Sequence, residues 1–232
     1  MGLKDDLESD VVKIFKTQWT TRDGVVVPEY TDIKLSNDGV DLDATILYAD
    51  LDSSTSMVDT QPTEFSGEIY KTFLLCASKL IRADGGHIRS YDGDRVMGIF
   101  IGDSKNSDAA KCGLKINWAV RNIIQPKMKA QYPNQTFQIK HIVGIDTSKV
   151  RAIRTGVRGD NDIAWVGRAP NYAAKLCSLN DDNNSTWITE AVYNRLKDES
   201  KYSNGVDMWQ KRSWTQMGGK TVYCSSYWWS VA

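Results

Sequence analysis

An Asp-Gly pair between two apolar runs restricts the fold more than any other feature of the sequence. The stretches HIRSY (87–91) and RVMGIFI (95–101) flank it, and this arrangement is a strong signal for a tight β-hairpin. The run ATILYADL (44–51) is apolar up to Asp50 and predicts a buried strand. Apolar residues recur every three or four positions over 63–83 and predict a helix. The pattern therefore begins as strand, helix, strand, strand.

The pattern continues with a second helix and a further strand. We expect the helix from about Ser107 to Gln125, with Pro126 ending or kinking it. The next strand is TFQIKHIVGID (136–146), and we expect VRAIRTG (150–156) to pair with it. These elements predict an α+β protein with a ferredoxin-like β-α-β-β-α-β core. The shorter elements that follow are a helix at 171–179, a strand at 186–189 and a β-rich tail over 206–229.

The chain divides into an extension and a main domain. Residues 3–18 predict a short amphipathic helix. Its apolar side consists of Leu7, Val11, Ile14 and Phe15. A loop-rich passage follows before the first buried strand. We interpret 1–43 as an N-terminal extension that covers a surface or a partner subunit, and 44–232 as the main domain.

Charge and cysteine content exclude several classes of protein. Lys+Arg and Asp+Glu both number 29 in 232 residues, so the net charge is zero. A neutral chain has no electrostatic basis for binding nucleic acid or a membrane surface. The four cysteines are far apart in the sequence, which suits free thiols in a reducing compartment. The N-terminus carries acids where a signal peptide carries bases. We therefore expect a cytoplasmic protein with no nucleic-acid partner and no membrane partner.

Two carboxylates lie at the ends of strands that the topology makes neighbours. Asp50 closes the first strand and Asp94 opens the third; alone, each would be an ordinary strand-end or turn residue. Two ionised carboxylates side by side repel each other, and Mg²⁺ or Mn²⁺ relieves the repulsion through hard oxygen ligands. Just beyond Asp50, the residues Ser53, Ser54 and Thr55 predict a helix start whose free amides can hold a triphosphate. The sequence therefore predicts metal-dependent phosphate chemistry at one rim of the sheet.

Four ordered motifs resemble those of the class III nucleotidyl cyclases. LYADLDSST (47–55) resembles that family's strand ending in a metal-binding Asp before a phosphate loop. GGHIRSYDGDRVMGIF (85–100) resembles the hairpin that carries the second metal Asp. IVGIDTSKV (142–150) resembles the family's Gly-Ile-His-Thr-Gly strand, and WVGRAPNYAAKLCSL (165–179) resembles its Gly-x-x-x-Asn-x-Ala-x-Arg helix. The resemblance implies that 44–232 is a nucleotidyl cyclase catalytic domain.

The resemblance also implies the chemistry of the site. Asp50, Asp94 and the backbone carbonyl of Leu51 would bind two divalent metal ions, Mn²⁺ or Mg²⁺. Asn171 would orient the ribose, and Lys175 stands where the family usually has an Arg that stabilises charge on the α-phosphate. Because lysine lacks the forked guanidinium of arginine, the identity of the residue that stabilises this charge stays open. The other candidates are Arg154, Arg168 and Lys220.

The positions that read the base depart from those of the purine cyclases. Ser90 and Ala164 replace the polar base-contacting residues, which argues against ATP and GTP as substrates. Tyr48 lies two residues before the first metal Asp, on the same strand face, and could fill space that a purine needs. Arg95 replaces a small residue and either makes a rim salt bridge or contacts the triphosphate or base. Trp165 adjoins the base-reading position, or is an exposed or interface tryptophan.

A base pocket without these polar contacts suits a pyrimidine, and this pattern resembles that of the stand-alone pyrimidine cyclases of bacterial Pycsar anti-phage systems. The resemblance implies synthesis of cyclic UMP from UTP, or of cyclic CMP from CTP, as a second messenger for a separate effector protein. Family frequency favours UTP. The resemblance also implies a head-to-tail homodimer with composite active sites, in which one subunit supplies the metals and the other the Asn and the charge stabiliser.

Two other functions stay open at this point. A cyclase-like module could bind a nucleotide without turnover, since Lys175 and the missing base readers could signal lost chemistry. Retention of Asp50, Asp94 and Asn171 favours the enzyme. A relative of the diguanylate cyclases is the weaker alternative, because GGHIR (85–89) lacks that family's Gly-Gly-acidic-acidic loop.

Overall fold

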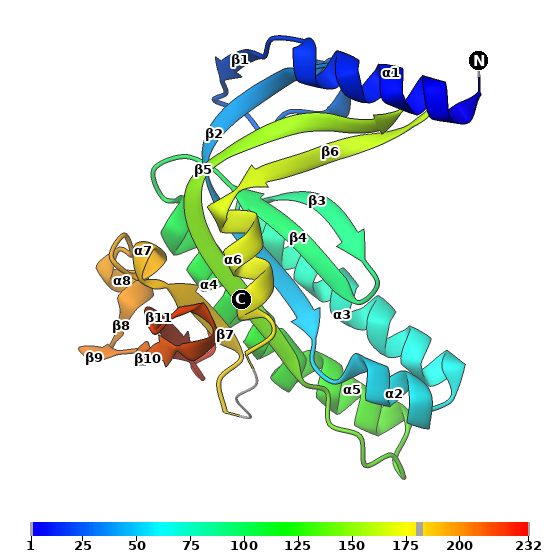
Figure 1. Cartoon of the computed structure of the whole chain (residues 1–232). Helices are drawn as coiled ribbons and strands as arrows, with labels where there is room; N and C mark the ends of the chain where they lie inside the picture. The colour runs from blue at the N-terminus through cyan, green and yellow to red at the C-terminus, as the bar shows by residue number, and fades with distance from the viewer. Residues whose placement is uncertain (1, 180–182, 232) are drawn as a thin grey trace.

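One mixed sheet organises the chain (Figure 1). The computed structural model describes residues 2–179 and 183–231. The strands of the main sheet in these ranges are β1 (Thr20–Asp23), β2 (Asp38–Leu51), β3 (His87–Asp92), β4 (Arg95–Phe100), β5 (His141–Val157), β6 (Asp160–Gly167), β7 (Thr186–Thr189), β10 (Gln210–Trp214) and β11 (Lys220–Ser225). A separate ribbon consists of β8 (Tyr202–Ser203) and β9 (Val206–Asp207). The helices are α1 (Leu3–Lys16), α2 (Ser54–Thr60), α3 (Thr63–Ala83), α4 (Lys105–Ala119), α5 (Gln125–Gln131), α6 (Arg168–Leu176), α7 (Glu190–Tyr193) and α8 (Asp198–Lys201). Across both described ranges, no helix combines the length and the apolar character needed to cross a bilayer.

The predicted core is confirmed as β2-α3-β3-β4-α4-β5. β2 lies in the middle and pairs antiparallel with β4 on one side and with β5 on the other. The helix predicted over 63–83 is α3. β2 begins at Asp38, earlier than the predicted Ala44, because its polar first half is satisfied within the sheet. Arg151 of β5, for example, donates two hydrogen bonds of 2.7 Å to the carboxylate of Asp41.

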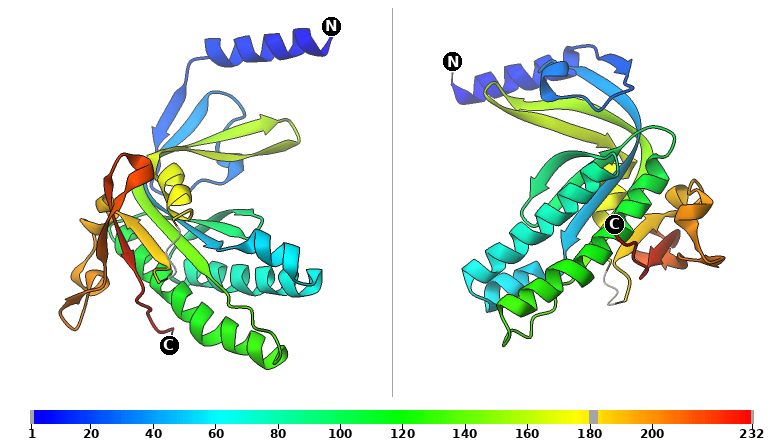
Figure 2. Two further views of the ribbon diagram at one scale, coloured as in Figure 1. Left: turned by 60° about the horizontal axis from the view of Figure 1, so that its bottom comes forward. Right: turned by 180° about the vertical axis from the view of Figure 1, so that it is seen from behind.

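Side chains alternate along β2 and so contribute to two different cores. Leu47 and Ala49 belong to the cluster that contains Phe73 of α3. Ile46 faces the other way and belongs to the cluster that contains Ala173 of α6. Figure 1 shows α6 in front of the sheet, and the rear view in Figure 2 has α3 and α4 in front. The sheet is therefore covered by α3 and α4 on one face and by α6 on the other.

The pairing predicted for VRAIRTG (150–156) is wrong. This stretch continues the same strand, β5, which runs unbroken from His141 to Val157. Its hairpin partner is β6, with Val157 opposite Asp160. The turn is supplied by Gly159, whose φ of +100° favours glycine. The residues between the two predicted strands contain neither Gly nor Pro, so nothing local interrupts the extended chain.

The end predicted for the second helix is also wrong. α4 begins at Lys105, and the helical path continues through a π-helical turn at Val120–Ile124 into α5, which ends at Gln131. Proline lacks an N–H group and its ring crowds the carbonyl one turn earlier. The wider π turn directly before Pro126 accommodates both effects. The proline is therefore compatible with continuation of the helix.

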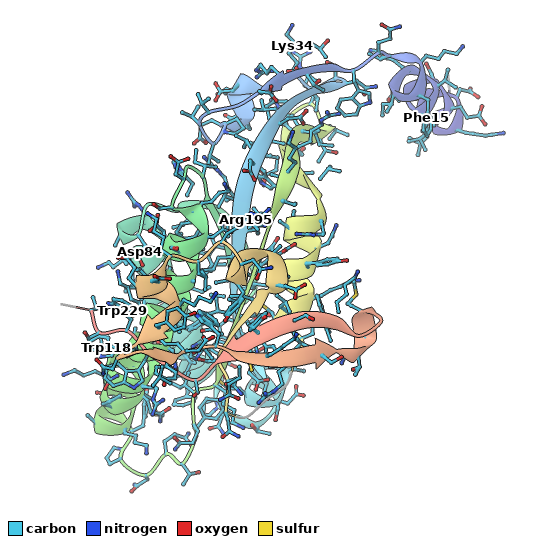
Figure 3. All side chains as sticks on the ribbon, turned by 90° about the vertical axis from the view of Figure 1, so that its left-hand side faces the viewer. Phe15, Lys34, Asp84, Trp118, Arg195 and Trp229 are labelled. Carbon is cyan, nitrogen blue, oxygen red and sulfur yellow. The ribbon has the colours of Figure 1, made fainter. Side chains whose placement is uncertain are left out.

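Helix α1 stands apart from the body of the molecule (Figure 3). None of its described residues is buried, and Phe15 is 86 % exposed. The segment that follows is attached, because β1 pairs in parallel with β2. The side-chain amide of Asn37 also donates to the backbone carbonyls of Ile14 and Thr17. Elsewhere in 1–43, Val27 and Ile33 are buried in the core cluster that contains Ala173. The extension therefore covers part of the molecule through these residues, and its partner-subunit role stays a prediction.

The C-terminal region extends the sheet beyond β5. β7 pairs in parallel with β5 and antiparallel with β11, and β11 forms a hairpin with β10. Trp209 and Trp214 are buried, so the tail closes against the core through these two side chains, whereas Trp228 is half exposed. This added hairpin places Lys220 near the first turn of α6, where both border one pocket.

Gly144 of β5 generates a prediction about how α6 is seated. A Cβ at Gly144 would lie 2.2 Å from the carbonyl oxygen of Ala173 and 2.9 Å from Cβ of Leu176. Because both atoms belong to α6, the helix would have to move as a unit. We expect Gly144→Ala to lower the free energy of unfolding by about 1–3 kcal/mol, measured by urea denaturation. Gly67→Ala in α3 is the matched control, because its Cβ meets nothing within 4 Å and should raise stability by up to about 1 kcal/mol. A Gly144→Ala variant as stable as the wild type would contradict this close contact.

Candidate active site

The register of the sheet brings Asp50 and Asp94 to the same rim. Ala49 pairs with Val96, so continuing that antiparallel register places Asp94 opposite Leu51, one residue after Asp50. Burial and, next in size, the neighbouring negative charge of Asp94 together raise the pKa of Asp50 to about 6, while Arg95 opposes this shift. The two carboxylates therefore interact, as the topology predicted.

The surroundings of this acid pair suit a divalent cation. Atom Oδ2 of Asp94 is buried and has no hydrogen-bond partner among the described residues. A buried carboxylate oxygen without a partner is costly, and a cation beside both acids would remove that cost and their mutual repulsion. Within 2–179 and 183–231, no cluster of three or more His, Cys, Asp or Glu side chains could hold a metal. Carbonyls, waters and substrate oxygens would have to complete the coordination, which is usual for Mg²⁺.

The loop after Asp50 leads directly into a short helix. Ser53 adopts a left-handed conformation with φ of +61°, and α2 begins at the next residue. The hydroxyl of Ser53 donates to the side chain of Asp52 at 3.2 Å and makes no cap hydrogen bond. The first amides of a helix have no partner within the helix. The predicted set of Ser53, Ser54 and Thr55 therefore lies at a helix start, next to the acid pair.

Tyr48 and Arg95 occupy the sheet face beside Asp50. The guanidinium of Arg95 lies 5.2 Å from the centre of the Tyr48 ring and donates to Asp92 Oδ2 at 2.7 Å. The salt bridge predicted as one alternative for Arg95 is therefore present, and the Nε atom of Arg95 is buried without a partner in the described chain. The Tyr48 hydroxyl donates to Met97 Sδ at 3.2 Å. The tyrosine thus fills space next to the acids.

Asn171 and Lys175 form a second group on α6. They lie one helical turn apart, and both are exposed. The Asn171 side-chain amide donates to the carbonyl of Gly167 at 2.9 Å, and Lys175 Nζ lies 3.7 Å from Met217 Sδ. Among the described residues, no hydrogen bond or ion pair joins either side chain to Asp50 or Asp94. The chain therefore presents two half-sites rather than one closed site.

The remaining base-site residues lie on different strands. Ser90 is half-buried on β3, opposite Met97 and next to an irregularity in the ladder. Ala164 and Trp165 lie on β6, in the hairpin with β5. Trp165 is half-buried against the cluster on the α6 side of the sheet, so it is not a freely exposed tryptophan. The structure brings Tyr48 and Arg95 to the acid pair, and it places Ala164 and Trp165 on a separate hairpin.

The four candidate cations differ in the hydrogen bonds and ion pairs that they already make within the chain. Arg168 donates to Asp146 and to the carbonyl of Thr147. Arg154 donates to Asn161 at 2.6 Å and lies over the ring of Tyr30. Lys175 and Lys220 have no anionic partner in the part of the chain that the structure describes. Lys220 lines a pocket of about 440 Å³ that Arg168 and Tyr172 of α6 also line.

Asp146 is a residue that the sequence interpretation missed. It is fully buried in β5, and it accepts hydrogen bonds from Arg168 of α6 and from the hydroxyl of Thr189. The signal in the sequence was an acid within the apolar run IVGID (142–146). Charged residues are rarely fully buried unless they are paired, so this position indicated an unidentified cationic partner.

The raised pKa of Asp50 generates a prediction about stability. Its folded-state value of about 6 exceeds the ordinary 3.8, so ionised Asp50 destabilises the folded chain at high pH, and the effect fades as pH falls below 6. In chelator at pH 8 we expect Asp50→Asn to raise Tm by about 2–4 °C, which is ~1 kcal/mol after solvent screening. The gain should shrink between pH 6 and pH 4, measured by thermal unfolding. Asp59→Asn on α2, an exposed residue, is the control. A gain independent of pH would rule out charge as its cause.

Comparison with known proteins identifies close full-length relatives. The chain is 52 % identical over 233 residues to a uridylate cyclase from Burkholderia cepacia, with 100 % of both chains covered. It is 48 % identical over 232 residues to a uridylate cyclase from Xanthomonas perforans, again with 100 % of both chains covered. No protein-family model matches the sequence.

Solved structures show the same fold at lower identity. The adenylyl cyclase CyaB from P. aeruginosa superposes with a TM-score of 0.68 at 20 % identity, over 81 % of this chain and 95 % of that one. A class III adenylyl cyclase-like ATP-binding protein from Pseudomonas aeruginosa superposes with a TM-score of 0.68 at 17 % identity, over 86 % of this chain and 45 % of that one. With the acid pair at the rim of this fold and relatives matched over their full length, the chain belongs to the uridylate cyclase family and is a nucleotidyl cyclase with the class III fold.

Proposed function

We propose that this chain converts UTP into 3′,5′-cyclic UMP and pyrophosphate. The main support for this proposal is the pair Asp50 and Asp94, two interacting carboxylates at the end of a central strand. The helix start beside them suits a triphosphate. The choice of uracil is supported by the names of the relatives from Burkholderia cepacia and Xanthomonas perforans. Cytidylate cyclase activity, with CTP as substrate, is the nearest alternative.

Each group of the rim has a role in this reaction. Asp50, Asp94 and the Leu51 carbonyl would hold two divalent ions, Mn²⁺ or Mg²⁺, which supply Lewis-acid activation of the ribose 3′-hydroxyl and neutralise the triphosphate. The backbone N–H groups of 53–55 donate hydrogen bonds to the phosphate oxygens. The 3′-oxygen attacks the α-phosphorus in line, the bond to the bridging oxygen breaks, pyrophosphate leaves, and the hydroxyl proton passes to solvent. Lys175 balances the charge that develops on the α-phosphate.

A homodimer would complete the site. Asn171 and Lys175 are exposed on α6 and make no contact with the acid pair of their own chain in the described residues. A second copy arranged head to tail would present its α6 to the rim that holds Asp50 and Asp94. In this arrangement Asn171 orients the ribose, and each dimer contains two composite sites. The outward apolar residues of α1 could be covered in the same assembly.

The space for the base favours a pyrimidine. Tyr48 and Arg95 fill the sheet face beside Asp50, where a second ring of a purine would need room. Ser90 and Ala164 are too short to read a purine edge at a distance, and Trp165 lies packed on its strand. The unpartnered Nε of Arg95 is a donor that suits a carbonyl oxygen or a phosphate.

A silent nucleotide-binding module is the alternative from another class. One solved protein of this fold carries the words ATP-binding protein in its description. Both acids and Asn171 are retained here, and these residues serve turnover rather than binding alone. We place the enzyme in the cytoplasm, where a separate effector would sense the cyclic nucleotide in anti-phage defence. Support for that biological role comes from resemblance to the Pycsar cyclases.

An assay with four nucleoside triphosphates tests the proposed reaction. Pyrophosphate release and the cyclic product are measured separately with UTP, CTP, ATP and GTP, each with Mn²⁺. We expect UTP to give the largest kcat/KM, with ATP and GTP at least about 100-fold lower because the base pocket is reduced. Asp94→Asn, which removes one acid of the pair, is expected to lose activity with every substrate. Faster turnover of CTP would favour the cytidylate alternative, and silence with all four would favour the binding module.

Mixing two inactive variants tests the composite site. Asp94→Asn lacks a metal ligand, and Asn171→Ala lacks the ribose contact. When the two chains exchange freely, half of the dimers are mixed and each has one intact site, so about a quarter of wild-type activity should return. Mixing Asp94→Asn with Asp50→Asn, which damages the same half-site twice, is the control and should return none. No recovery in the first mixture, with dimers shown to exchange, would overturn the head-to-tail arrangement.

A further inference from the structure

An ion pair between a buried carboxylate and an arginine whose side chain is 45 % exposed attaches α6 to β5. Asp146 of β5 has no exposed surface. Arg168, the first residue of α6, donates from Nε to Oδ2 of Asp146 at 3.0 Å and from Nη2 to Oδ1 at 3.1 Å. The hydroxyl of Thr189 donates to the same carboxylate. Burial raises the pKa of Asp146, and Thr189, Arg168 and the backbone N–H of Thr147 oppose that shift, so the ionised form depends on these partners.

This ion pair is one of three contacts that seat α6 on the strand. Residues two apart in a strand face the same side, and Gly144, Asp146 and Ser148 all face α6. Ser148 Oγ accepts the N–H of Ala169 at 3.0 Å and so serves as the cap that Gly167 cannot supply. At the other end of α6, Gly144 leaves no room for a Cβ beneath the helix backbone. Both ends of α6 are therefore located relative to β5.

The orientation of α6 decides where the two proposed catalytic side chains point. Asn171 and Lys175 project from the same side of the helix, one turn apart. The side chain of Asn171 donates to the carbonyl of Gly167 at 2.9 Å, next to the residue that the ion pair holds. A rotation of α6 on the sheet would move both side chains together. A displacement of 1 Å is enough to cost a reaction about 100-fold.

The guanidinium of Arg168 is held by the protein on several sides. Besides the carboxylate, its Nη2 donates to the carbonyl of Thr147 at 2.6 Å. Its charged centre lies 5.4 Å from the ring centre of Tyr172, and that ring contacts Trp214 edge-on with 5.4 Å between centroids. A bidentate pair with these further contacts fixes the direction of the side chain. Arg168 is therefore poorly placed to follow charge that develops on a substrate.

We infer that Asp146 is a positioning residue of the cyclase, and that Arg168 is its partner rather than the cation that stabilises the transition state. The ion pair sets the orientation of α6 and so directs Asn171 and Lys175 toward the nucleotide. The inference rests on the proposed function. An ion pair of this kind adds little to stability compared with apolar packing, but its geometry is directional, which is the property that a helix carrying catalytic groups needs.

Steady-state kinetics with UTP and Mn²⁺ test this role. We expect Asp146→Asn and Arg168→Met each to lower kcat about 10- to 100-fold, with KM changed by less than about threefold. The double variant should be no slower than the worse single variant, because the two residues act as one unit. Arg168→Lys, which keeps the charge, should recover part of the loss. Asp41→Asn is the matched control: it breaks the bidentate pair with Arg151 in the outer half of the same strands and should change kcat less than about twofold.

Mixing experiments then separate positioning from a general loss of structure. Asp146→Asn mixed with Asp94→Asn should recover activity toward a quarter of the wild type, because the intact α6 and the intact acid rim come from different chains. Asp146→Asn mixed with Asn171→Ala should recover none, since both chains then lack a working α6. Thermal unfolding of each variant shows whether it is folded. Should Asp146→Asn fail to fold, Arg168→Met enters the same two mixtures in its place.

Specific results would overturn the inference. If Arg168→Met is much slower than Asp146→Asn and the double variant is slower than both, Arg168 acts on the substrate itself. If Asp94→Asn and Asn171→Ala complement each other but folded Asp146→Asn complements neither, Asp146 serves the whole fold instead of α6. A wild-type chain that is inactive with all four triphosphates would overturn the proposed function and the positioning role together.

Discussion

The antiparallel pairing of β2 between β4 and β5 determines where every group of the acid rim, the sheet edge that holds Asp50 and Asp94, lies. Because successive residues of a strand point to opposite faces, this pairing sends Leu47 into the core under α3 and α4 and leaves Tyr48 and Asp50 on the other face. The register with β4 then carries the β3–β4 turn, with Asp94, to the end of β2. A slip of one residue would exchange the two faces and turn Asp50 toward the apolar core.

The acid rim works against the stability of the folded chain. Burial and the charge of Asp94 raise the pKa of Asp50, and the buried Oδ2 of Asp94 has no partner among the described residues. Selection for stability alone would remove such a pair, and functional sites are where destabilising features persist. The repulsion between the two acids also makes the rim attractive to a divalent ion, because a bound cation relieves both desolvation and repulsion.

The start of helix α6 shows the opposite arrangement, in which a buried carboxylate is paired. Asp146 is buried, yet Arg168 and Thr189 satisfy its carboxylate, and the close approach at Gly144 holds the rest of the helix against β5. The rigid seat leaves Asn171 exposed on the outer side of α6. The molecule thus has two kinds of site. The carboxylates of Asp50 and Asp94 repel each other and so suit a bound cation, whereas α6 is fixed to β5 and so presents its side chains in a defined direction.

Local sequence patterns determined the order of the core elements, the Asp-Gly hairpin and the helix over 63–83, because periodicity and turn chemistry act between residues close in the chain. The proximity of Asp50 and Asp94 also followed, since one antiparallel topology was enough to place them. Only the tertiary structure decided that β5 runs unbroken, that a π turn carries the helix past Pro126, and that Asp146 meets its partners on α6 and β7. The strand β5 and the partners of Asp146 depend on pairing between residues far apart in sequence, which no local pattern encodes. The π turn is a local accommodation of Pro126, but a proline alone does not specify it.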